Sequence, residues 1–282
     1  MLPVKKIYVD TKYRTANSVS SSNFKYELPY SVTLPEHTAF YLTDFACPHS
    51  WYTIESGVND KLYLTLHGDG NPALALECYI VTITSGNYDG ASLAVEIETR
   101  IQLVIGQTWI TTSFNVVLQQ LTIYMSLTDT TFKILTRNDI KTQLNGTWNG
   151  TSYNVNDPND ICDILSQTET NSSMYSSTSP FVSGYLDLQP IKNIYISSPN
   201  LGSYTTIGPT GQQTIIKKVP VSADFGYVIF DELMPTNDYL DCSRQSLKTI
   251  EFLFRDVNNN TINLHGANLS FSIVFDIQNP DI

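Results

Sequence analysis

The sequence predicts an all-β protein: an antiparallel β-sandwich or jelly roll with one short amphipathic helix and a polar insertion. Two observations lead to this prediction. Short segments in which apolar and polar residues alternate recur along most of the 282 residues, and clusters of Gly, Pro and Asn separate them. Charged residues make up only 15% of the chain, against about 25% in ordinary soluble domains, and Ser, Thr, Asn and Tyr take their place. Such a composition suits strands that are joined by polar loops.

The N-terminal region is expected to hold one strand and an arm. Residues 5–9 have the pattern of a strand. The Ser-rich stretch 11–23 has no hydrophobic period, which favours an arm or a long loop. We therefore expect residues 1–23 to form an N-terminal strand and polar arm.

Residues 24–137 are expected to form the first part of the sandwich body. Its predicted strands alternate in polarity or are rich in aromatic and β-branched residues: 24–28, 38–45, 61–66, 78–84, 114–118, 121–127 and 131–136. One segment has a different period, because apolar residues recur every three or four positions from Leu93 to Val104 and Gly106 follows. This spacing predicts an amphipathic helix near 91–105.

Residues 138–180 are dominated by Asn, Ser, Thr, Asp and Gly, and we expect a polar loop insertion there. Residues 181–282 are expected to complete the sandwich body. Their clearest feature is a predicted hairpin of two strands, 247–255 and 269–276. Apolar residues spaced by two give each strand one face for a core: Phe252, Phe254, Phe271, Ile273 and Phe275. The length of the chain permits one large β domain or two small ones.

The charge balance disfavours nucleic acid as a main partner. Sixteen basic and 27 acidic side chains give a net charge of −11, whereas phosphate neutralisation needs clustered Lys and Arg. The basic clusters, at residues 5–6, 12–14 and 217–218, are short, and we expect a solvated surface at each. No signal peptide and no membrane span are expected. The four cysteines lie far apart, which is typical of a reducing compartment and not of a disulfide framework.

No catalytic, cofactor-binding or metal-binding residues are expected, and the protein is not expected to be an enzyme. The four histidines lack metal-ligand spacing, and the nucleophile-elbow, P-loop and dinucleotide motifs are absent. Several carboxylates could in principle pair for glycoside hydrolysis on a β scaffold: Asp44, Glu55, Asp231, Glu232 and Asp256. A solvated or turn-forming role is the expectation for each of them.

Both ends of the chain carry strand-and-turn motifs in a distinctive order. Those of the N-terminal end are Ile7-Tyr-Val-Asp10, Ser22-Asn-Phe-Lys-Tyr-Glu-Leu-Pro29, Leu34-Pro-Glu36, Tyr41-Leu-Thr-Asp44 and Pro48-His-Ser-Trp-Tyr-Thr-Ile54. Those of the C-terminal end are Ile194-Tyr-Ile-Ser197, Lys218-Val-Pro-Val221, Leu247-Lys-Thr-Ile-Glu-Phe-Leu-Phe-Arg-Asp256, Asn263-Leu-His-Gly266 and Phe271-Ser-Ile-Val-Phe275. In this order they resemble the minor capsid (penton) proteins of polinton-like viruses, virophages and Maverick-polinton elements. Residues 138–178 match no pattern of that family.

The resemblance implies a single jelly roll with a structural role. It implies a homopentamer at the icosahedral vertices of a small DNA virus or virophage, beside a double-jelly-roll major capsid protein. It places the protein in the virion, after synthesis in the host cytoplasm or a viral factory and without secretion. The candidate interface residues are Tyr13 and Arg14 of the arm, and His49, Trp51 and Tyr52 where the chain turns after a strand. A plain surface loop and a packed corner are the respective alternatives.

Two other functions remain open at this point. A receptor-binding spike or fibre-like module would use the same Tyr-, Ser- and Asn-rich loops to recognise a glycan or a protein. A β-sandwich carbohydrate-active enzyme is the third possibility. A pentamer that enters shells, a trimer that binds cells, and turnover of a glycan would distinguish the three.

Overall fold

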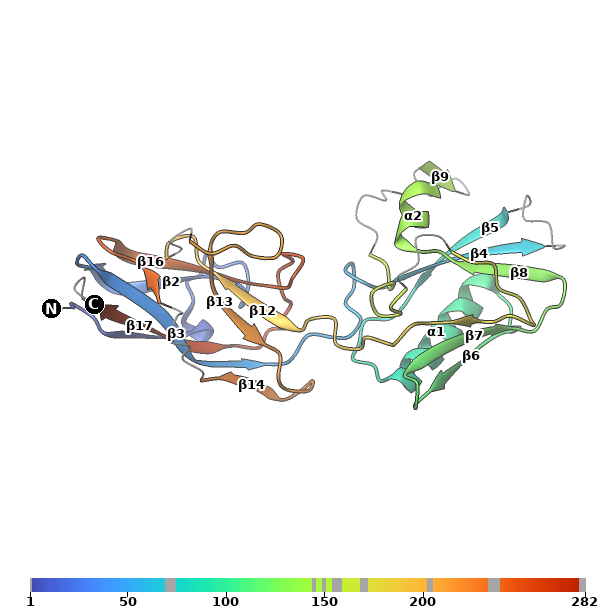
Figure 1. The fold of residues 1–282 in the computed structure, drawn as a ribbon, viewed down its shortest axis with the longest axis horizontal. Helices are drawn as coiled ribbons and strands as arrows, with labels where there is room; N and C mark the ends of the chain where they lie inside the picture. The colour runs from blue at the N-terminus through green and yellow to red at the C-terminus, as the bar shows by residue number, and fades with distance from the viewer. Residues whose placement is uncertain are drawn as a thin grey trace. The chain divides into compact units, whose positions relative to one another are not determined.

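The chain folds into two compact units, each with a core of its own. The computed structural model describes residues 2–68, 75–143, 146–148, 151–153, 159–167, 172–201, 205–232 and 239–278. Met1–Trp51 and Ile191–Ile282 form one unit, which we call the jelly-roll unit (Figure 1). Tyr52–Pro190 form the other, which we call the inserted unit because it interrupts the first in sequence.

The jelly-roll unit consists of two antiparallel sheets. The first contains, in spatial order, β1 (Lys6–Asp10), β17 (Ser270–Ile277), β3 (Thr38–Pro48) and β14 (Val228–Asp231), and the short β15 (Leu240–Asp241) also pairs with β3. The second contains β13 (Ile215–Pro220), β12 (Asn193–Ser197), β16 (Ser246–Arg255) and β2 (Asn23–Thr33). Apart from β15, consecutive described strands of this unit lie in different sheets, except for β12 and β13, which pair with each other in the second sheet. This is the double Greek-key order of a jelly roll. The predicted antiparallel β-sandwich is therefore confirmed.

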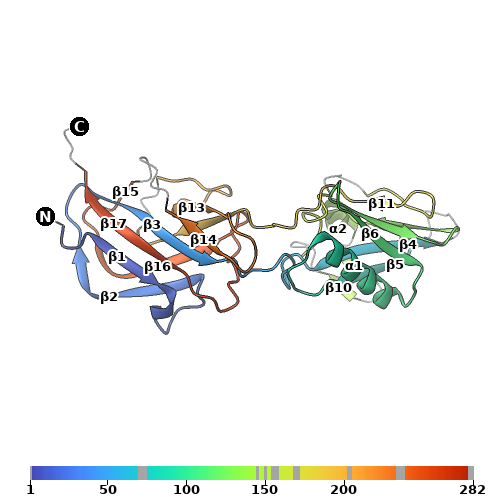
Figure 2. The same cartoon turned by 90° about the horizontal axis from the view of Figure 1, so that it is seen from below.

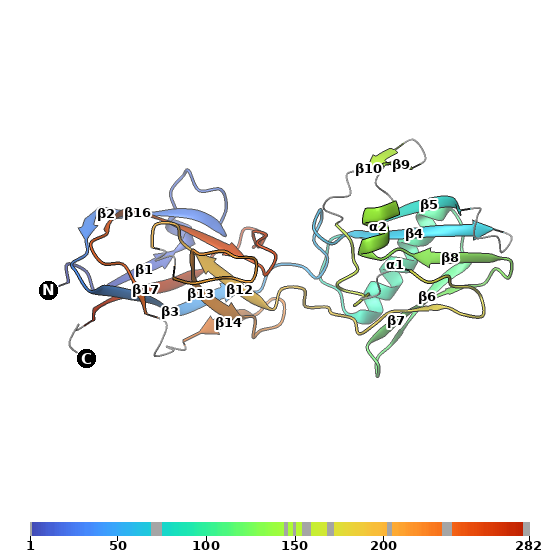
Figure 3. The ribbon, with the colours of Figure 1, turned by 45° about the horizontal axis from the view of Figure 1, so that its top comes forward.

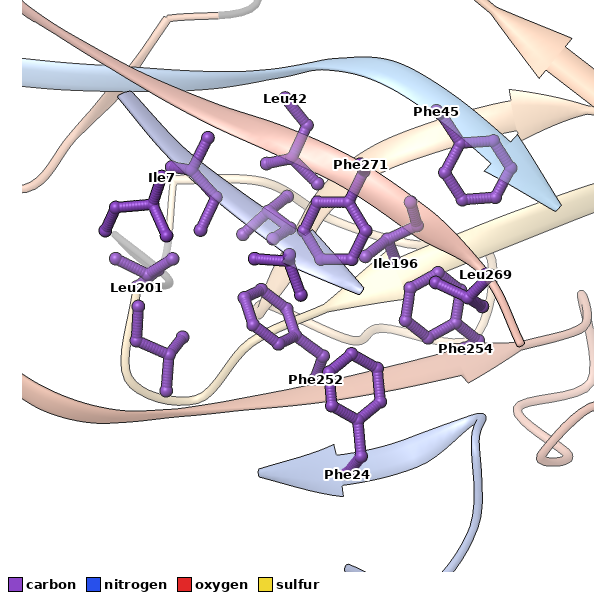
Figure 4. Close-up of a cluster of buried hydrophobic side chains, with 14 of the residues drawn as sticks. Ile7, Phe24, Leu42, Phe45, Ile196, Leu201, Phe252, Phe254, Leu269 and Phe271 are labelled. Carbon is purple, nitrogen blue, oxygen red and sulfur yellow. The ribbon is translucent and has the colours of Figure 1, made fainter. Parts of the chain in front are cut away.

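The core of this unit lies between the two sheets and is rich in phenylalanine (Figure 4). The predicted inward faces are confirmed, since Phe252 and Phe254 of β16 and Phe271 of β17 are all buried. The predicted hairpin is not, because β16 pairs with β2 and β12 whereas β17 pairs with β1 and β3. The two strands face one another across the core, with the Phe252 and Phe271 rings 5.0 Å apart. Alternation specifies which face of a strand is buried, but not which strand lies beside it.

The described part of the inserted unit contains two three-stranded sheets, two α-helices and a short hairpin, and Figures 2 and 3 label its elements. One sheet has the order β5 (Ala75–Thr82), β4 (Lys61–Gly68), β8 (Thr130–Ile134), and the other β11 (Phe181–Val182), β7 (Gln120–Met125), β6 (Ile110–Asn115). The remaining elements are α1 (Gly90–Ile105), α2 (Arg137–Gln143), β9 (Gly146–Trp148) and β10 (Thr151–Tyr153). Side chains of α1 and of both three-stranded sheets share one buried cluster.

The predicted helix near 91–105 is confirmed as α1. It begins at a capping box, in which the Asp89 carboxylate accepts a hydrogen bond from the Ser92 backbone N–H at 2.7 Å and the Ser92 hydroxyl accepts one from the Asp89 backbone N–H at 3.0 Å. It ends at Gly106, whose φ of 72° is the left-handed conformation that glycine adopts readily. The buried stripe of α1 contains Leu93, Ile97 and Ile101.

The structure divides the chain differently from the expected segments. The predicted first part of the body, 24–137, runs across both units, and the insertion begins at Tyr52 and not at residue 138. Strands of both units have the same period of two, so their patterns carry no mark of the unit to which each strand belongs. The expected loop 138–180 contains β9, β10 and all of α2 except its first residue. Residues 144–145, 149–150, 154–158 and 168–171 of it lie outside the described part of the chain.

Candidate assembly surfaces

The expected N-terminal arm is held against its own unit. After β1, a short helix η1 (Thr11–Tyr13) is anchored by the buried Thr11, whose N–H donates to Leu269 O at 3.0 Å and whose hydroxyl accepts from Leu269 N at 3.0 Å. Tyr13 is 71% exposed. Arg14 is also exposed, and its guanidinium donates to Thr11 O at 2.9 Å. These two predicted residues therefore lie together on an ordered surface segment.

An open pocket of about 300 Å³ lies beside Arg14. The segments 20–22 and 261–266 provide most of its lining. The hydroxyl of Ser22 is buried there and has no hydrogen-bond partner. No group of three or more metal-ligating side chains occurs in this pocket or elsewhere among the described residues.

The structure brings His49 and Trp51 together in a packed corner. His49 Nδ1 lies 2.7 Å from Ala223 O, and its ring lies 4.3 Å from that of Trp51. Only 8% of His49 and 3% of Trp51 is exposed, so both side chains bury most of their surface within the chain. Tyr52, which is half-buried, is the first residue of the inserted unit.

An apolar edge strand was not among the predicted surfaces. Strand β14 lies at one end of its sheet and directs Val228 and Phe230 outward, with exposed fractions of 41% and 64%. Tyr227, just before the strand, is 70% exposed. The sequence signal was the run Tyr-Val-Ile-Phe, which is apolar on both faces, whereas a strand of a lone sandwich needs only one apolar face. An exposed edge with outward aromatic residues is a typical binding surface for another chain.

A buried ion pair supports this edge from inside. Lys217 of β13 lies 3.0 Å from the Asp231 carboxylate of β14 and donates to Leu42 O of β3 at 3.0 Å. Both charged side chains are at least nine-tenths buried. The expectation of a solvated surface at residues 217–218 is therefore wrong for Lys217, although Lys218 is exposed. Asp231 is likewise neither solvated nor in a turn, and the pair joins the two sheets at their β13 and β14 edges.

The two units differ strongly in charge. The jelly-roll unit has 11 basic and 13 acidic residues, and the inserted unit has 5 and 14. The inserted unit thus carries −9 of the net charge of −11, and a negative charge of this size is unfavourable beside the phosphates of nucleic acid. None of the described helices is long and apolar enough to cross a membrane.

Comparison with known proteins shows the fold. No protein-family profile and no curated protein sequence matches the chain. Among solved structures, the crystal structure of the mavirus penton protein is similar, with a TM-score of 0.54 and 9% sequence identity. The match covers 96% of this chain and 98% of the mavirus protein, so it includes both units. The jelly-roll fold that the sequence resemblance implied is therefore confirmed, and the chain shares the fold of a penton protein along nearly its whole length.

Proposed function

We propose that this protein is a structural penton subunit, which forms pentamers at the vertices of an icosahedral capsid. The observation that carries the proposal is the extent of the likeness to the mavirus penton protein, 96% of one chain and 98% of the other. A jelly roll by itself is shared by proteins of many functions. A match that includes both the jelly-roll unit and the inserted unit is more restrictive, and it favours a structural role over catalysis.

The jelly-roll unit has the two different surfaces that a five-fold ring needs. In a ring, one face of each subunit contacts a different face of the next. Strand β14, with Tyr227 and Phe230, lies at one end of its sheet, and β1 lies at the other end. Tyr8 on β1 is 70% exposed, and Tyr13 follows directly after that strand. We propose that the β14 edge of one subunit packs against the β1 edge of its neighbour, with Tyr13 and Arg14 at that contact.

The remaining features of the proposal follow from this role. The partners are further copies of the chain and a double-jelly-roll major capsid protein of a small DNA virus or virophage. The acidic inserted unit favours a position away from the packaged genome, because phosphates repel it. The location is the virion, after synthesis in the cytoplasm or a viral factory of the host.

Light scattering of the purified chain at several concentrations, with negative-stain images, tests the pentamer. We expect five-fold rings for the native chain and monomers for Phe230→Asp, because a charge at the centre of an apolar contact is strongly unfavourable. Val257→Asp is the matched control, since Val257 is a 44% exposed apolar residue that belongs to neither edge strand. A trimer that binds cells would support the spike function instead. Rings that persist in Phe230→Asp would exclude β14 from the contact.

A further inference from the structure

The turn between β6 and β7 exposes three consecutive aliphatic side chains. The exposed fractions of Val116, Val117 and Leu118 are 69%, 85% and 58%. The sequence predicts a strand over 114–118, but β6 ends at Asn115 and the three residues form the turn. This turn projects from the sheets of the inserted unit (Figure 3). A convex apolar tip of this kind gains nothing from its own fold, because none of the three side chains is buried.

The backbone of the tip is hydrogen-bonded from within the turn. The Asn115 side-chain oxygen accepts from the N–H groups of Val117 and Leu118, at 3.0 and 3.1 Å. The Gln119 side-chain amide donates to Val116 O at 2.7 Å. Three polar backbone groups at the tip therefore have partners that do not depend on water. Backbone groups that enter hydrocarbon must be satisfied internally, and this turn meets the requirement at those three positions.

The hairpin that carries the tip is free of charge. The inserted unit has 5 basic and 14 acidic residues, yet none lies between Ile101 and Thr128. Charged side chains are the most costly to bring into a bilayer, so their absence around the tip suits contact with lipid. Protein-binding hot spots are instead enriched in Trp, Tyr and Arg, and Leu and Val are under-represented in them. The composition of the tip thus favours a lipid surface over a protein partner.

We propose that Val116, Val117 and Leu118 insert into the interfacial region of an electrically neutral lipid bilayer and dock the inserted unit on it. The lipid is of the zwitterionic or uncharged class, because the acidic inserted unit is repelled by anionic headgroups. Tyr185 lies close to the tip, because the next residue, Leu186, donates its N–H to the carbonyl oxygen of Gln119 at 2.8 Å, and Gln119 directly follows Leu118. It is 64% exposed and can rest at the headgroup level, where tyrosine is enriched. This surface is separate from the edges proposed for the pentamer.

Flotation of the full chain with phosphatidylcholine vesicles tests the proposal. The native chain should float with the vesicles, and replacing a fifth of the lipid by phosphatidylserine should weaken its binding at low salt. Val117→Asp should lower the partition coefficient at least about tenfold. Leu103→Asp is the matched control, because Leu103 of α1 is an aliphatic residue of the same unit with 69% exposure, and it should bind like the native chain.

A second variant tests the role of the turn itself. Asn115→Ala keeps all three aliphatic side chains but removes the acceptor of two N–H groups, so it should also weaken binding. Unchanged melting temperatures of the variants would show that they remain folded. The proposal is overturned if the native chain does not float with neutral vesicles, if Val117→Asp floats like Leu103→Asp, or if binding requires anionic lipid. Loss of cell attachment in Val117→Asp without vesicle binding by the native chain would assign the tip to a protein partner.

Discussion

Replacing Lys217 by Met should lower the unfolding free energy of the jelly-roll unit by about 3–5 kcal/mol, the usual effect of removing one partner of a buried ion pair. Lys217 Nζ lies 3.0 Å from the Asp231 carboxylate and 3.0 Å from Leu42 O. Only 4% of the lysine side chain and 9% of the aspartate side chain is exposed. The methionine variant therefore leaves a buried carboxylate without its cation.

The double variant Lys217→Met/Asp231→Leu separates charge from packing. It removes both charges and fills the site with apolar side chains of similar length. Replacing a complete buried pair in this way is often neutral or stabilising by about 1–4 kcal/mol. The loss of a donor to Leu42 O offsets this by about 1–3 kcal/mol. We therefore expect the double variant to lie much closer to the native chain than the single variant does.

Urea unfolding followed by tryptophan fluorescence measures the effect. Trp51 is buried in the jelly-roll unit, whereas Trp109 and Trp148 belong to the inserted unit. In a background of Trp109→Phe and Trp148→Phe, the signal reports the jelly-roll unit alone, which matters because two units need not unfold in one step. Lys218→Met is the control and should change the free energy by less than about 0.5 kcal/mol. A loss of less than about 1 kcal/mol in Lys217→Met would refute the argument.

Three further outcomes are expected. Asp89→Ala should destabilise the inserted unit by about 0.5–2 kcal/mol, measured by Trp109 fluorescence, because it removes the N-cap of α1. Hydrogen bonds from Ser92 hold the pKa of Asp89 below its ordinary value. The stabilisation is therefore present above the unfolded-state pKa of about 4 and is lost as the pH falls through the lower folded-state pKa. A stability difference between the native chain and Asp89→Ala that grows on acidification would contradict this explanation. Gly90→Ala should lower the melting temperature, because its Cβ would lie 2.3 Å from the Phe114 ring, and an unchanged value would show that the ring moves freely. Burial raises the pKa of the Cys47 thiol to about 12, so iodoacetamide at pH 8 should alkylate it at least about a hundredfold more slowly in the folded chain than in urea, as mass spectrometry would show; equal rates would mean that the thiol is accessible.

The candidate surfaces were only partly visible in the sequence. Tyr13 is exposed, as a contact residue must be, whereas His49 and Trp51 occupy the packed corner that was their alternative. Exposure depends on what lies opposite a side chain, and aromatic residues occur both in cores and at interfaces. The exposed Phe230 and the buried Phe252 therefore look alike in sequence.

The sequence by itself determined the local structure. The spacing of Leu93, Ile97 and Ile101 specified α1, and alternation specified which side of β16 and β17 is buried. Both signals are local, because a helix and a strand repeat within a few residues. Only the tertiary structure decided which strands pair, and therefore where the insertion begins. Strand β3, near the start of the chain, lies between β17 and β14, more than 170 residues away in sequence. Strands this far apart in sequence become neighbours only when they pack around a shared core. The same packing determined which face of β13 is buried, so that Lys217 lies inside the unit and Lys218 on its surface.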